Sequence, residues 1–356
     1  MRIVVAMSGG VDSSVAAALL AEQGHDVIGV SMQLYDQSDG QTSFGSCCSL
    51  DDLHDARRVA AALNIPHYIM NFERQFDSTV VSNFVSEYAS GRTPLPCARC
   101  NADLKFATLA DRARTFDADC VATGHYARVV RDETTGRFLL KRGIDSAKDQ
   151  AYFLFSLTQD QLAQACFPVG DRAKDAVRDY ARARRLPVAD KPDSQEICFI
   201  PDDDYAAFVT SRAPDAARPG AIVDEGGREL GRHGGIHRFT IGQRKGLGLS
   251  SSPGGKPLYV LALNPADGQV VVGPRPSLER RTLTASLVNW IVEEPALAVR
   301  ATVQIRHRHQ PAPASVRALS DGRAEVTFDQ PQIAVTPGQA VVFYDEDLVL
   351  GGGWID

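Results

Sequence analysis

The chain opens with Met1-Arg2-Ile3-Val4-Val5-Ala6-Met7-Ser8-Gly9-Gly10-Val11-Asp12-Ser13-Ser14. Its apolar first half predicts a buried strand, and its second half predicts a turn into a helix. The apolar face of that helix is made by Val15, Ala16, Leu19 and Leu20. The two glycines let backbone amides point at an anion, and the serine hydroxyls and the helix dipole face the same point. We therefore expect the turn to bind a phosphate group.

Strands and helices continue to alternate as far as about residue 200. Strands are expected at Ile3–Met7, Val27–Leu34, His67–Phe72 and Cys120–Thr123. Helical patterns separate them, and one of these begins after Ser49, a predicted N-cap. This alternation indicates right-handed crossovers and a doubly wound parallel sheet of the α/β class. Ligands of such sheets bind at the carboxyl ends of the strands.

From about Pro219 the pattern changes to frequent glycine and proline, with apolar residues at a period of two. The turn Pro265-Ala266-Asp267-Gly268 lies between Leu258–Asn264 and Gln269–Val272 and predicts a hairpin. Short strands consistent with a small barrel are expected at Val299–Ile305, Ser315–Leu319, Ala324–Phe328, Ala340–Tyr344 and Leu348–Leu350. The expected domains are an α/β domain over 1–204, a small β-rich domain over 205–280 and a β-barrel over 281–356.

Composition narrows the class of protein less than these patterns do. The 356 residues are 44% hydrophobic and 23% charged, an ordinary globular balance. No apolar run approaches the roughly 18 residues of a membrane helix, and the first residues do not resemble a signal peptide, so we expect a cytoplasmic protein without a membrane partner. The net charge of −6 gives no general argument for nucleic-acid binding, although a local basic face can hold a polyanion.

The seven cysteines are expected to be reduced and therefore available for chemistry. Cys100 follows a proline-stiffened loop and is expected near a helix N-terminus, where the dipole and nearby cations favour the reactive thiolate. Cys97-x-x-Cys100 alone fits a redox pair, two metal ligands or a coincidence. Zinc would need four ligands, and no second pair completes the set, whereas three thiols including Cys198 suit an iron–sulfur cluster.

The other cysteines have simpler interpretations. Cys120 and Cys166 lie in apolar contexts, which is typical of packing residues. Cys47 and Cys48 lie in a segment rich in Ser and Gly, which indicates mobile thiols rather than ligands.

The turn lacks the Gly-Lys-Ser/Thr of a Walker loop. It resembles the pyrophosphatase-loop ATPases, of the adenine nucleotide alpha hydrolase or HUP-like fold, which cleave ATP between the α- and β-phosphates to adenylate a substrate. This resemblance implies an ATP site formed by Ala6, Met7, Ser8, Gly9, Gly10, Val11, Asp12, Ser13, Met32 and Gly124. Asp12 would serve Mg²⁺ or pyrophosphate. The alternative is an ordinary glycine-rich turn, which any doubly wound sheet needs.

With the cysteines added, the whole chain resembles the bacterial tRNA-specific 2-thiouridylases. The similar stretches are Met7–Ser14, Gly91–Phe106, Thr123–Tyr126, Lys148–Leu157, Lys191–Phe199, Gly234–Gly248 and Pro337–Tyr344. The resemblance implies ATP-dependent 2-thiolation of the wobble uridine in tRNAs for Lys, Glu and Gln, through adenylation of the C2 oxygen. Sulfur from a cysteine desulfurase or a relay protein would reside on Cys198 as a persulfide, and Cys100 would form a transient disulfide with Cys198. The enzyme is expected to be a monomer.

The resemblance also implies contacts to tRNA. By position these come from Leu95, Pro96 and Cys97 at the target base, from His125, Lys148, Asp149 and Gln150, and from Arg306, His307 and Gln339 in the barrel. Cys97 departs from the family pattern, in which Asp is common and is thought to act as an acid or base. The third thiol leaves a second route open, in which Cys97, Cys100 and Cys198 hold a [4Fe–4S] cluster.

Two other functions compete with thiolation. Another adenylating ATPase, of the lysidine, GMP or argininosuccinate synthase type, would use the same turn and leave Cys97, Cys100 and Cys198 without a function. A non-catalytic RNA-binding or iron–sulfur carrier protein would not need the turn at Ser8–Ser13. Phosphate contacts can also come from basic residues, of which Arg178, Arg182, Arg184 and Arg185 lie on one predicted helix. A solvated charged face is the alternative for such a cluster.

Overall fold

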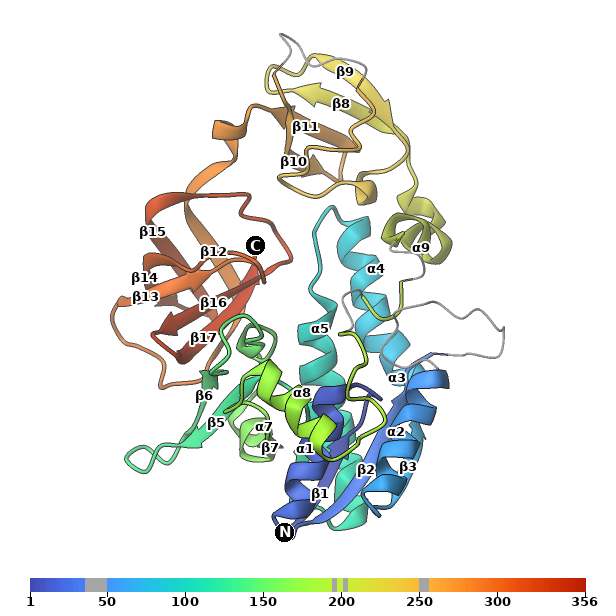
Figure 1. Cartoon of the computed structure of the whole chain (residues 1–356). Helices are drawn as coiled ribbons and strands as arrows, with labels where there is room; N and C mark the ends of the chain where they lie inside the picture. The colour runs from blue at the N-terminus through green and yellow to red at the C-terminus, as the bar shows by residue number, and fades with distance from the viewer. Residues whose placement is uncertain (36–49, 194–196, 201–203, 250–255) are drawn as a thin grey trace. The chain divides into compact units, whose positions relative to one another are not determined.

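The structure is a computed structural model that describes residues 1–35, 50–193, 197–200, 204–249 and 256–356 (Figure 1). Cys47, Cys48 and the predicted N-cap Ser49 lie outside the described residues.

The N-terminal part is built on a five-stranded sheet in the order β3-β2-β1-β4-β7, in which every pair is parallel. Its strands are β1 (Arg2–Ala6), β2 (Asp26–Gln33), β3 (His67–Asn71), β4 (Cys120–Ala122) and β7 (Ala165–Cys166). The first four are the predicted strands, each within a residue of its expected ends. The parallel α/β class is confirmed, while the two-residue β7 is too short for any periodic pattern to reveal.

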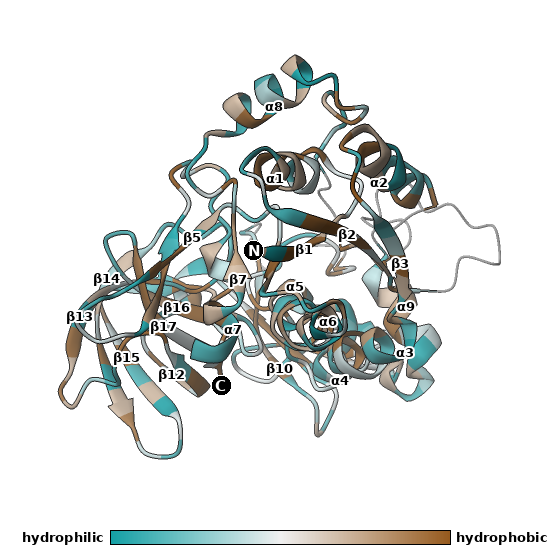
Figure 2. Ribbon diagram, turned by 90° about the horizontal axis from the view of Figure 1, so that it is seen from below, coloured by the Kyte–Doolittle hydropathy of each residue, from teal (hydrophilic) through white to brown (hydrophobic). Residues whose placement is uncertain are grey.

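Helices cover both faces of this sheet, as the view from below shows (Figure 2). One face carries α1 (Val11–Glu22) and α2 (Leu50–Ala62), and α8 (Lys174–Ala183) packs against α1. The other face carries a continuous helical run of α5 (Pro96–Arg99), η2 (Cys100–Thr108) and α6 (Leu109–Ala113). Because water is excluded from both sides, the central strands are apolar along most of their length.

Shorter helices and one hairpin complete the description of this part of the chain. The helices are α3 (Glu73–Phe76), η1 (Asp77–Val81), η3 (Arg114–Phe116), η4 (Ala151–Phe153) and α7 (Gln159–Ala163). The hairpin is formed by β5 (Ala127–Arg131) and β6 (Phe138–Arg142) and was not predicted. Its strand β6 pairs with Leu348 at Lys141, and Arg128 forms an ion pair with Asp347 at 2.7 Å.

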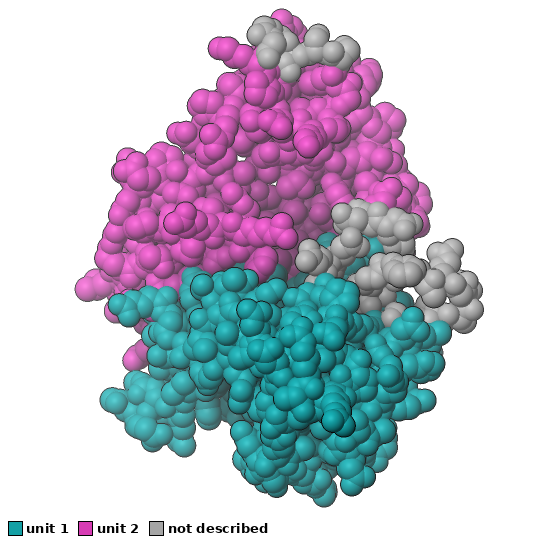
Figure 3. Space-filling model, viewed as in Figure 1, with its two compact units in different colours: residues 1–80, 96–203, 346–350 teal, residues 81–95, 204–345, 351–356 magenta. Residues whose placement is uncertain are grey.

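By their contacts, the residues fall into two compact units (Figure 3). Unit 1 comprises Met1–Val80, Pro96–Asp203 and Glu346–Leu350. Unit 2 comprises Val81–Leu95, Asp204–Asp345 and Gly351–Asp356. Glu346–Leu350 therefore belongs with the β5–β6 hairpin to unit 1.

Unit 2 contains a small sheet in the order β10-β11-β8-β9. Its strands are β8 (Gly220–Asp224), β9 (Glu229–His233), β10 (Tyr259–Asn264) and β11 (Gln269–Gly273). β10 and β11 form the predicted antiparallel hairpin. The helices of unit 2 are α4 (Ser82–Ala89), α9 (Tyr205–Arg212), η6 (Pro214–Ala216), η7 (Ile236–Arg238) and η9 (Arg275–Leu278).

A closed barrel forms the rest of unit 2, except that the first three residues of its last strand, 348–350, belong to unit 1. Its strands are β12 (Glu279–Trp290), β13 (Val299–Gln304), β14 (Ala312–Leu319), β15 (Arg323–Ile333), β16 (Ala340–Asp345) and β17 (Leu348–Ile355). They follow the order β12-β15-β14-β13-β16-β17, and β12 pairs with β17 to close the ring. The predicted barrel is confirmed. Strand β12 was missed because it opens on four exposed residues, Glu279–Thr282, that show no alternation of apolar and polar side chains. Of the described helices, none has the length and hydropathy needed to cross a membrane.

Candidate active site

The turn between β1 and α1 is shaped by two close backbone approaches in unit 1. Gly9 has a φ of +72°, and a Cβ atom there would lie 2.2 Å from the carbonyl oxygen of Asp52. Gly124 follows β4, and a Cβ atom there would lie 2.5 Å from the amide nitrogen of Ser13. Both positions exclude a side chain, so the turn is held between the start of α2 and the end of β4.

The first turn of α1 is open to an anion. Its N-cap is Gly10, and no side chain of the described residues caps it. The Ser13 hydroxyl accepts a hydrogen bond from the Ser8 amide at 3.2 Å and donates to the Gly10 carbonyl at 3.2 Å. Amides and the positive end of the helix dipole therefore face the same point, which is the chemistry that a phosphate group requires.

The remaining residues of the predicted ATP site differ in what they can offer. The side chains of Met7 and Val11 belong to hydrophobic clusters, so only their backbone groups can face a nucleotide. Met32 is buried on β2, beside Met70 of β3. Ser8 is exposed, and Ala6 ends β1 half-buried.

Asp12, in the first turn of α1, is paired with a buried lysine. Lys174 Nζ lies 2.8 Å from each Asp12 carboxylate oxygen, and the Tyr126 hydroxyl donates to Asp12 Oδ1 at 2.7 Å. The same ammonium lies 2.8 Å from Asp193 Oδ1. The sequence analysis identified Asp12 but missed Lys174, since no local pattern marks a partner 162 positions away.

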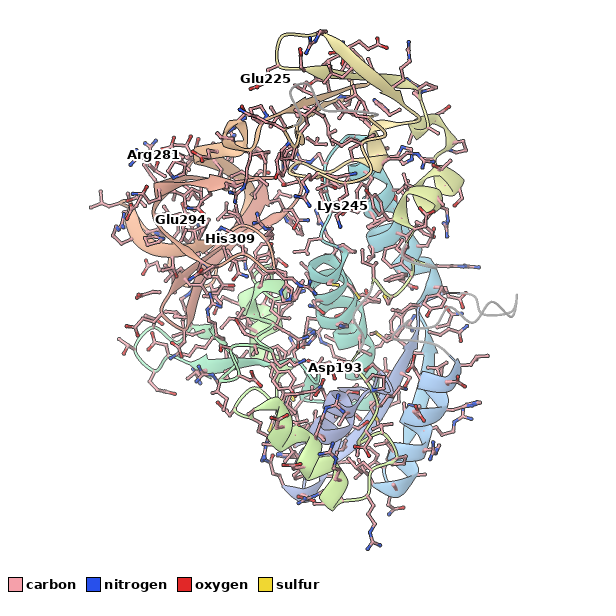
Figure 4. The ribbon with its side chains drawn as sticks, turned by 45° about the horizontal axis from the view of Figure 1, so that its top comes forward. Asp193, Glu225, Lys245, Arg281, Glu294 and His309 are labelled. Carbon is pink, nitrogen blue, oxygen red and sulfur yellow. The ribbon has the colours of Figure 1, made fainter. Side chains whose placement is uncertain are left out.

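Asp193, which is labelled in Figure 4, pairs with two cations besides Lys174. It accepts hydrogen bonds from Lys148 at 2.8 Å and from Arg178 at 2.7 Å. Burial alone would raise the pKa of Asp193, but hydrogen bonds from Lys148 and Lys174 outweigh burial and lower its pKa to about 2. The carboxylate is therefore charged at every physiological pH.

Arg178 and Arg182 of α8, and Arg184 just after its end, are paired within the chain and do not form an open basic face. Arg178 binds Asp193 and the carbonyls of Ala189 and Lys191. The remaining pairs join Arg182 with Asp179 and Asp190, and Arg184 with Glu22. Intramolecular partners thus favour a structural interpretation of this cluster over phosphate binding.

The predicted tRNA contacts of unit 1 also have partners within the chain. Asp149 accepts hydrogen bonds from Arg142 and from the amides of Gly143 and Ala151. Gln150 accepts one from the Tyr126 amide at 3.0 Å, and Lys148 binds Asp193 as described above.

His125 lies 2.7 Å from the Thr123 hydroxyl, measured from Nδ1. Burial lowers the pKa of His125 well below its usual value, and the nearby ammonium of Lys105 adds to this effect. The ring is therefore neutral at neutral pH.

Cys100 opens a π-helix of nine residues, Cys100–Thr108. π-Helical segments are rare and are frequently found at functional sites. The helical run begins at Pro96, so Cys100 lies after its first turn rather than at its N-terminus. Cys100 is buried, whereas Cys97 is exposed. Asn101 donates to the Phe153 carbonyl at 3.1 Å and so fixes the turn that follows Cys100.

Cys198 lies in a turn of unit 1 that is closed by the Ile200 amide and the Ile197 carbonyl, 3.0 Å apart. The adjacent Phe199 packs edge-on against Phe76 of α3, with ring centroids 5.4 Å apart. Helix α3 also contacts the π-helix that begins at Cys100. The segment that contains Cys198 and the π-helix that begins at Cys100 therefore both contact the same short helix.

The described residues offer no ready metal site. Within the part of the chain that the structure covers, no three His, Cys, Asp or Glu side chains form a group that could hold a metal ion. Cys97, Cys100 and Cys198 therefore do not fit a [4Fe–4S] cluster as they are arranged, and we derive no step through iron. Asp12 is occupied by Lys174, so it does not fit as a ready Mg²⁺ ligand either. Cys120 and Cys166 pack against the hydrophobic core of the sheet, as expected.

Of the other predicted tRNA contacts, unit 2 holds Leu95, Arg306, His307 and Gln339. The Gln339 side-chain amide donates to the carbonyls of Thr93 at 3.0 Å and Pro94 at 3.1 Å, so it holds the segment that leads to Leu95. Arg306 and His307 lie on the turn after β13, and their carbonyls accept hydrogen bonds from the buried Gln304. In this structure Gln339 positions a loop, which the sequence analysis did not foresee.

A parallel sheet whose first strand leads through a glycine turn into an uncapped helix is typical of nucleotide-binding domains of the HUP class. The family profile described as "tRNA methyl transferase HUP domain" matches residues 1–202. The profiles "tRNA methyl transferase PRC-barrel domain" and "Aminomethyltransferase beta-barrel domain" match residues 206–274 and 280–355.

The chain belongs to the tRNA-specific 2-thiouridylase family. It is 53% identical over 360 residues to the tRNA-specific 2-thiouridylase MnmA of Geotalea uraniireducens, covering 100% of this chain and 95% of that protein. It is 54% identical over 370 residues to the enzyme of the same name from Solibacter usitatus, covering 99% of each chain. A solved 4-thiouridine synthetase–RNA complex with bound ATP is 15% identical, with a TM-score of 0.36, over 60% of this chain and 50% of that one. A similarity that low says nothing further about the site.

We expect Gly124→Ala to abolish ATP binding while the protein remains folded. The added methyl group would lie 2.5 Å from the Ser13 nitrogen and 2.6 Å from the Asp12 carbonyl carbon, so the turn would have to move. Calorimetric titration with ATP measures the effect, and circular dichroism checks the fold. Gly226→Ala is the control, because its nearest neighbour is the flexible Asp224 side chain at 3.4 Å. Wild-type ATP affinity in Gly124→Ala would contradict the placement of the site.

Proposed function

We propose that this chain is a tRNA-uridine 2-sulfurtransferase, which uses ATP to replace the C2 oxygen of the wobble uridine of tRNAs for Lys, Glu and Gln with sulfur. The observation that carries the proposal is that one compact unit contains both an uncapped helix start after its first strand and two cysteine segments that contact α3. Relatives that match the whole chain are named tRNA-specific 2-thiouridylases, which supports the proposal. Two profile descriptions mention methyl transfer, but they name domains and not the activity of this chain.

The first step proposed is adenylation. The C2 oxygen of the uridine attacks the α-phosphorus, and the bond to the β-phosphate oxygen breaks to release pyrophosphate. The open first turn of α1 and the Ser8 and Ser13 hydroxyls would bind the phosphates at the moment when charge develops on the leaving group. The C2 oxygen then leaves as part of AMP, which is a far better leaving group than oxide.

In the second step Cys198 carries sulfur as a persulfide and Cys100 resolves it. The terminal sulfur attacks C2, and the C2–oxygen bond breaks to release AMP. The Cys100 thiolate then attacks Cys198 Sγ, so the sulfur–sulfur bond breaks, its electron pair goes to the thiouridine sulfur, and a Cys100–Cys198 disulfide forms. A cysteine desulfurase or a relay protein would supply the sulfane sulfur, and an external dithiol would reduce the disulfide. In a second order of events, Cys100 first releases hydrosulfide, which then attacks C2.

In the proposed function, residues of each unit contact the tRNA. We place Leu95, Pro96 and Cys97 beside the target base, because they connect the loop that Gln339 holds to the helical run that contains Cys100. Phosphate contacts from the barrel, residues 281–356 in our division, would come from Arg306 and His307. His125, Lys148, Asp149, Gln150 and Gln339 would act through the intramolecular hydrogen bonds described above, which shape the surface that the tRNA meets. We infer that the enzyme works as a monomer in the cytoplasm, where its tRNA substrates are found.

Serine in place of either Cys100 or Cys198 is expected to reduce thiolation about a thousandfold or more, because both thiols act in one sequence of bond exchanges. The double variant should be no worse than either single variant. Mass spectrometry of nucleosides from the reacted tRNA measures 2-thiouridine, and Cys120→Ala, altered in a packing residue, is the control. Thiolation that survives both substitutions would favour an adenylating enzyme of the lysidine synthetase type instead.

The cluster route has its own test, which uses protein purified without oxygen. Because the described residues show no three-ligand group, we expect iron-free protein to thiolate tRNA when supplied with a persulfide donor and ATP. Iron, labile sulfide and 2-thiouridine are measured on the same preparations of wild type and Cys97→Ser. Activity that rises with iron content and disappears with iron in Cys97→Ser would establish the [4Fe–4S] route.

A further inference from the structure

We propose that Lys174 binds the leaving pyrophosphate, and that Asp12 positions Lys174 instead of acting as a magnesium ligand by itself. The inference rests on the proposed function, since adenylation releases pyrophosphate at the turn that contains Asp12.

The geometry places the Lys174 ammonium at the open end of α1. Asp12 is the second residue of that helix and adjoins Ser13, whose amide nitrogen packs against Gly124. Lys174 Nζ lies 2.8 Å from both Asp12 oxygens and 5.7 Å from the centre of the Tyr126 ring. A positive charge and the helix amides thus flank the same small region, which suits a ligand with several negative charges.

Lys174 is held at its backbone amide and at its side-chain ammonium. It is the first residue of α8, and its backbone amide donates to the Asp145 carboxylate at 2.9 Å. Its ammonium is held by Asp12 and Asp193 as described above. A cation fixed in this way needs little reorganisation when charge develops on a leaving group, which is the condition for electrostatic stabilisation.

Exposure shows from which side a ligand would approach. The Lys174 side chain is 8% exposed, whereas its partner Asp12 is 30% exposed. A buried ion pair is costly to desolvate and is weak evidence of a purely stabilising role. Asp193 is also compensated by Lys148 and Arg178. Lys174 donates to both carboxylate oxygens of Asp12, so one of these two hydrogen bonds can pass to a phosphate oxygen while the other keeps the ammonium in place.

Lys174 would take the place of the phosphate-binding lysine that a Walker loop contains and that this turn lacks. A Walker loop supplies a lysine to the β- and γ-phosphates from within its own sequence, whereas Ser8–Ser14 contains none. Lys174 would provide the equivalent charge from the start of α8, 162 positions along the chain.

A second lysine beside the turn has a different environment and provides a matched comparison. Lys191 Nζ donates to the Gly9 carbonyl at 3.2 Å and pairs with Asp52 and Asp55 of α2 at 2.6 Å each. It binds the outer side of the turn to α2 and so stabilises the shape of the turn. Its loss should therefore affect every nucleotide that the turn binds.

The test is calorimetric binding of three probes, α,β-methylene-ATP, AMP and inorganic pyrophosphate, to the full chain. We expect Lys174→Met to weaken α,β-methylene-ATP and pyrophosphate about 10- to 100-fold, the range for a hydrogen bond to a charged group, and to leave AMP within about twofold. Lys174→Arg should recover much of the loss. Lys191→Met should weaken AMP and the ATP analogue alike.

A second variant distinguishes a loss of ligand binding from misfolding of the protein. Asp12→Asn combined with Lys174→Met removes both charges together, so no unpaired charge is left buried. It should show the same selective loss of pyrophosphate binding. Equal losses for AMP and pyrophosphate in the Lys174 variants, or unchanged pyrophosphate binding, would overturn the inference. If wild type thiolates tRNA in that case, only the inference fails, whereas a wild type that binds no ATP and forms no thiouridine would overturn the proposed function.

Discussion

The close approach of Gly124 to the turn between β1 and α1 is the constraint on which the rest of the site depends. Its backbone lies against the Asp12–Ser13 peptide, at a distance that no other residue could permit. The next residues along the chain are held there as a consequence. His125 reaches back to Thr123, and the Tyr126 hydroxyl reaches Asp12. One backbone contact thereby joins a segment predicted to contact tRNA to the predicted nucleotide site.

Ion pairs extend this connection through unit 1. Asp12 pairs with Lys174, Lys174 with Asp193, and Asp193 with Lys148, a residue expected to contact tRNA. A change at the Asp12 end of this series alters the charge that its other members experience, because successive pairs share Lys174 and Asp193. In the proposed function, the network would be a physical route by which binding of ATP and positioning of tRNA affect each other. In unit 2, Gln339 performs a related task when it holds Thr93 and Pro94, just before the predicted base contacts.

Local patterns in the sequence predicted the features that depend on neighbouring residues. Short apolar runs located the strands β1 to β4, alternation of apolar and polar residues located most of the barrel, and the Ser8–Ser14 motif located the turn. Contacts between distant residues had no such signal, as for Lys174 with Asp12 and for Gln339 with Thr93, which are 162 and 246 positions apart. The π-helix at Cys100 was also missed, because its sequence has the apolar spacing of an ordinary helix and only packing can select the wider turn.

The central claim is that the turn presents ATP so that the uridine oxygen attacks the α-phosphorus. The most direct measurement follows that oxygen, in tRNA synthesised with ¹⁸O at C2 of the wobble uridine. After a single turnover with ATP and a persulfide donor, mass spectrometry should find the label in the phosphate of AMP, in amounts equal to the 2-thiouridine formed. Label in inorganic phosphate together with ADP, or label released to water while AMP stays unlabelled, would contradict the account.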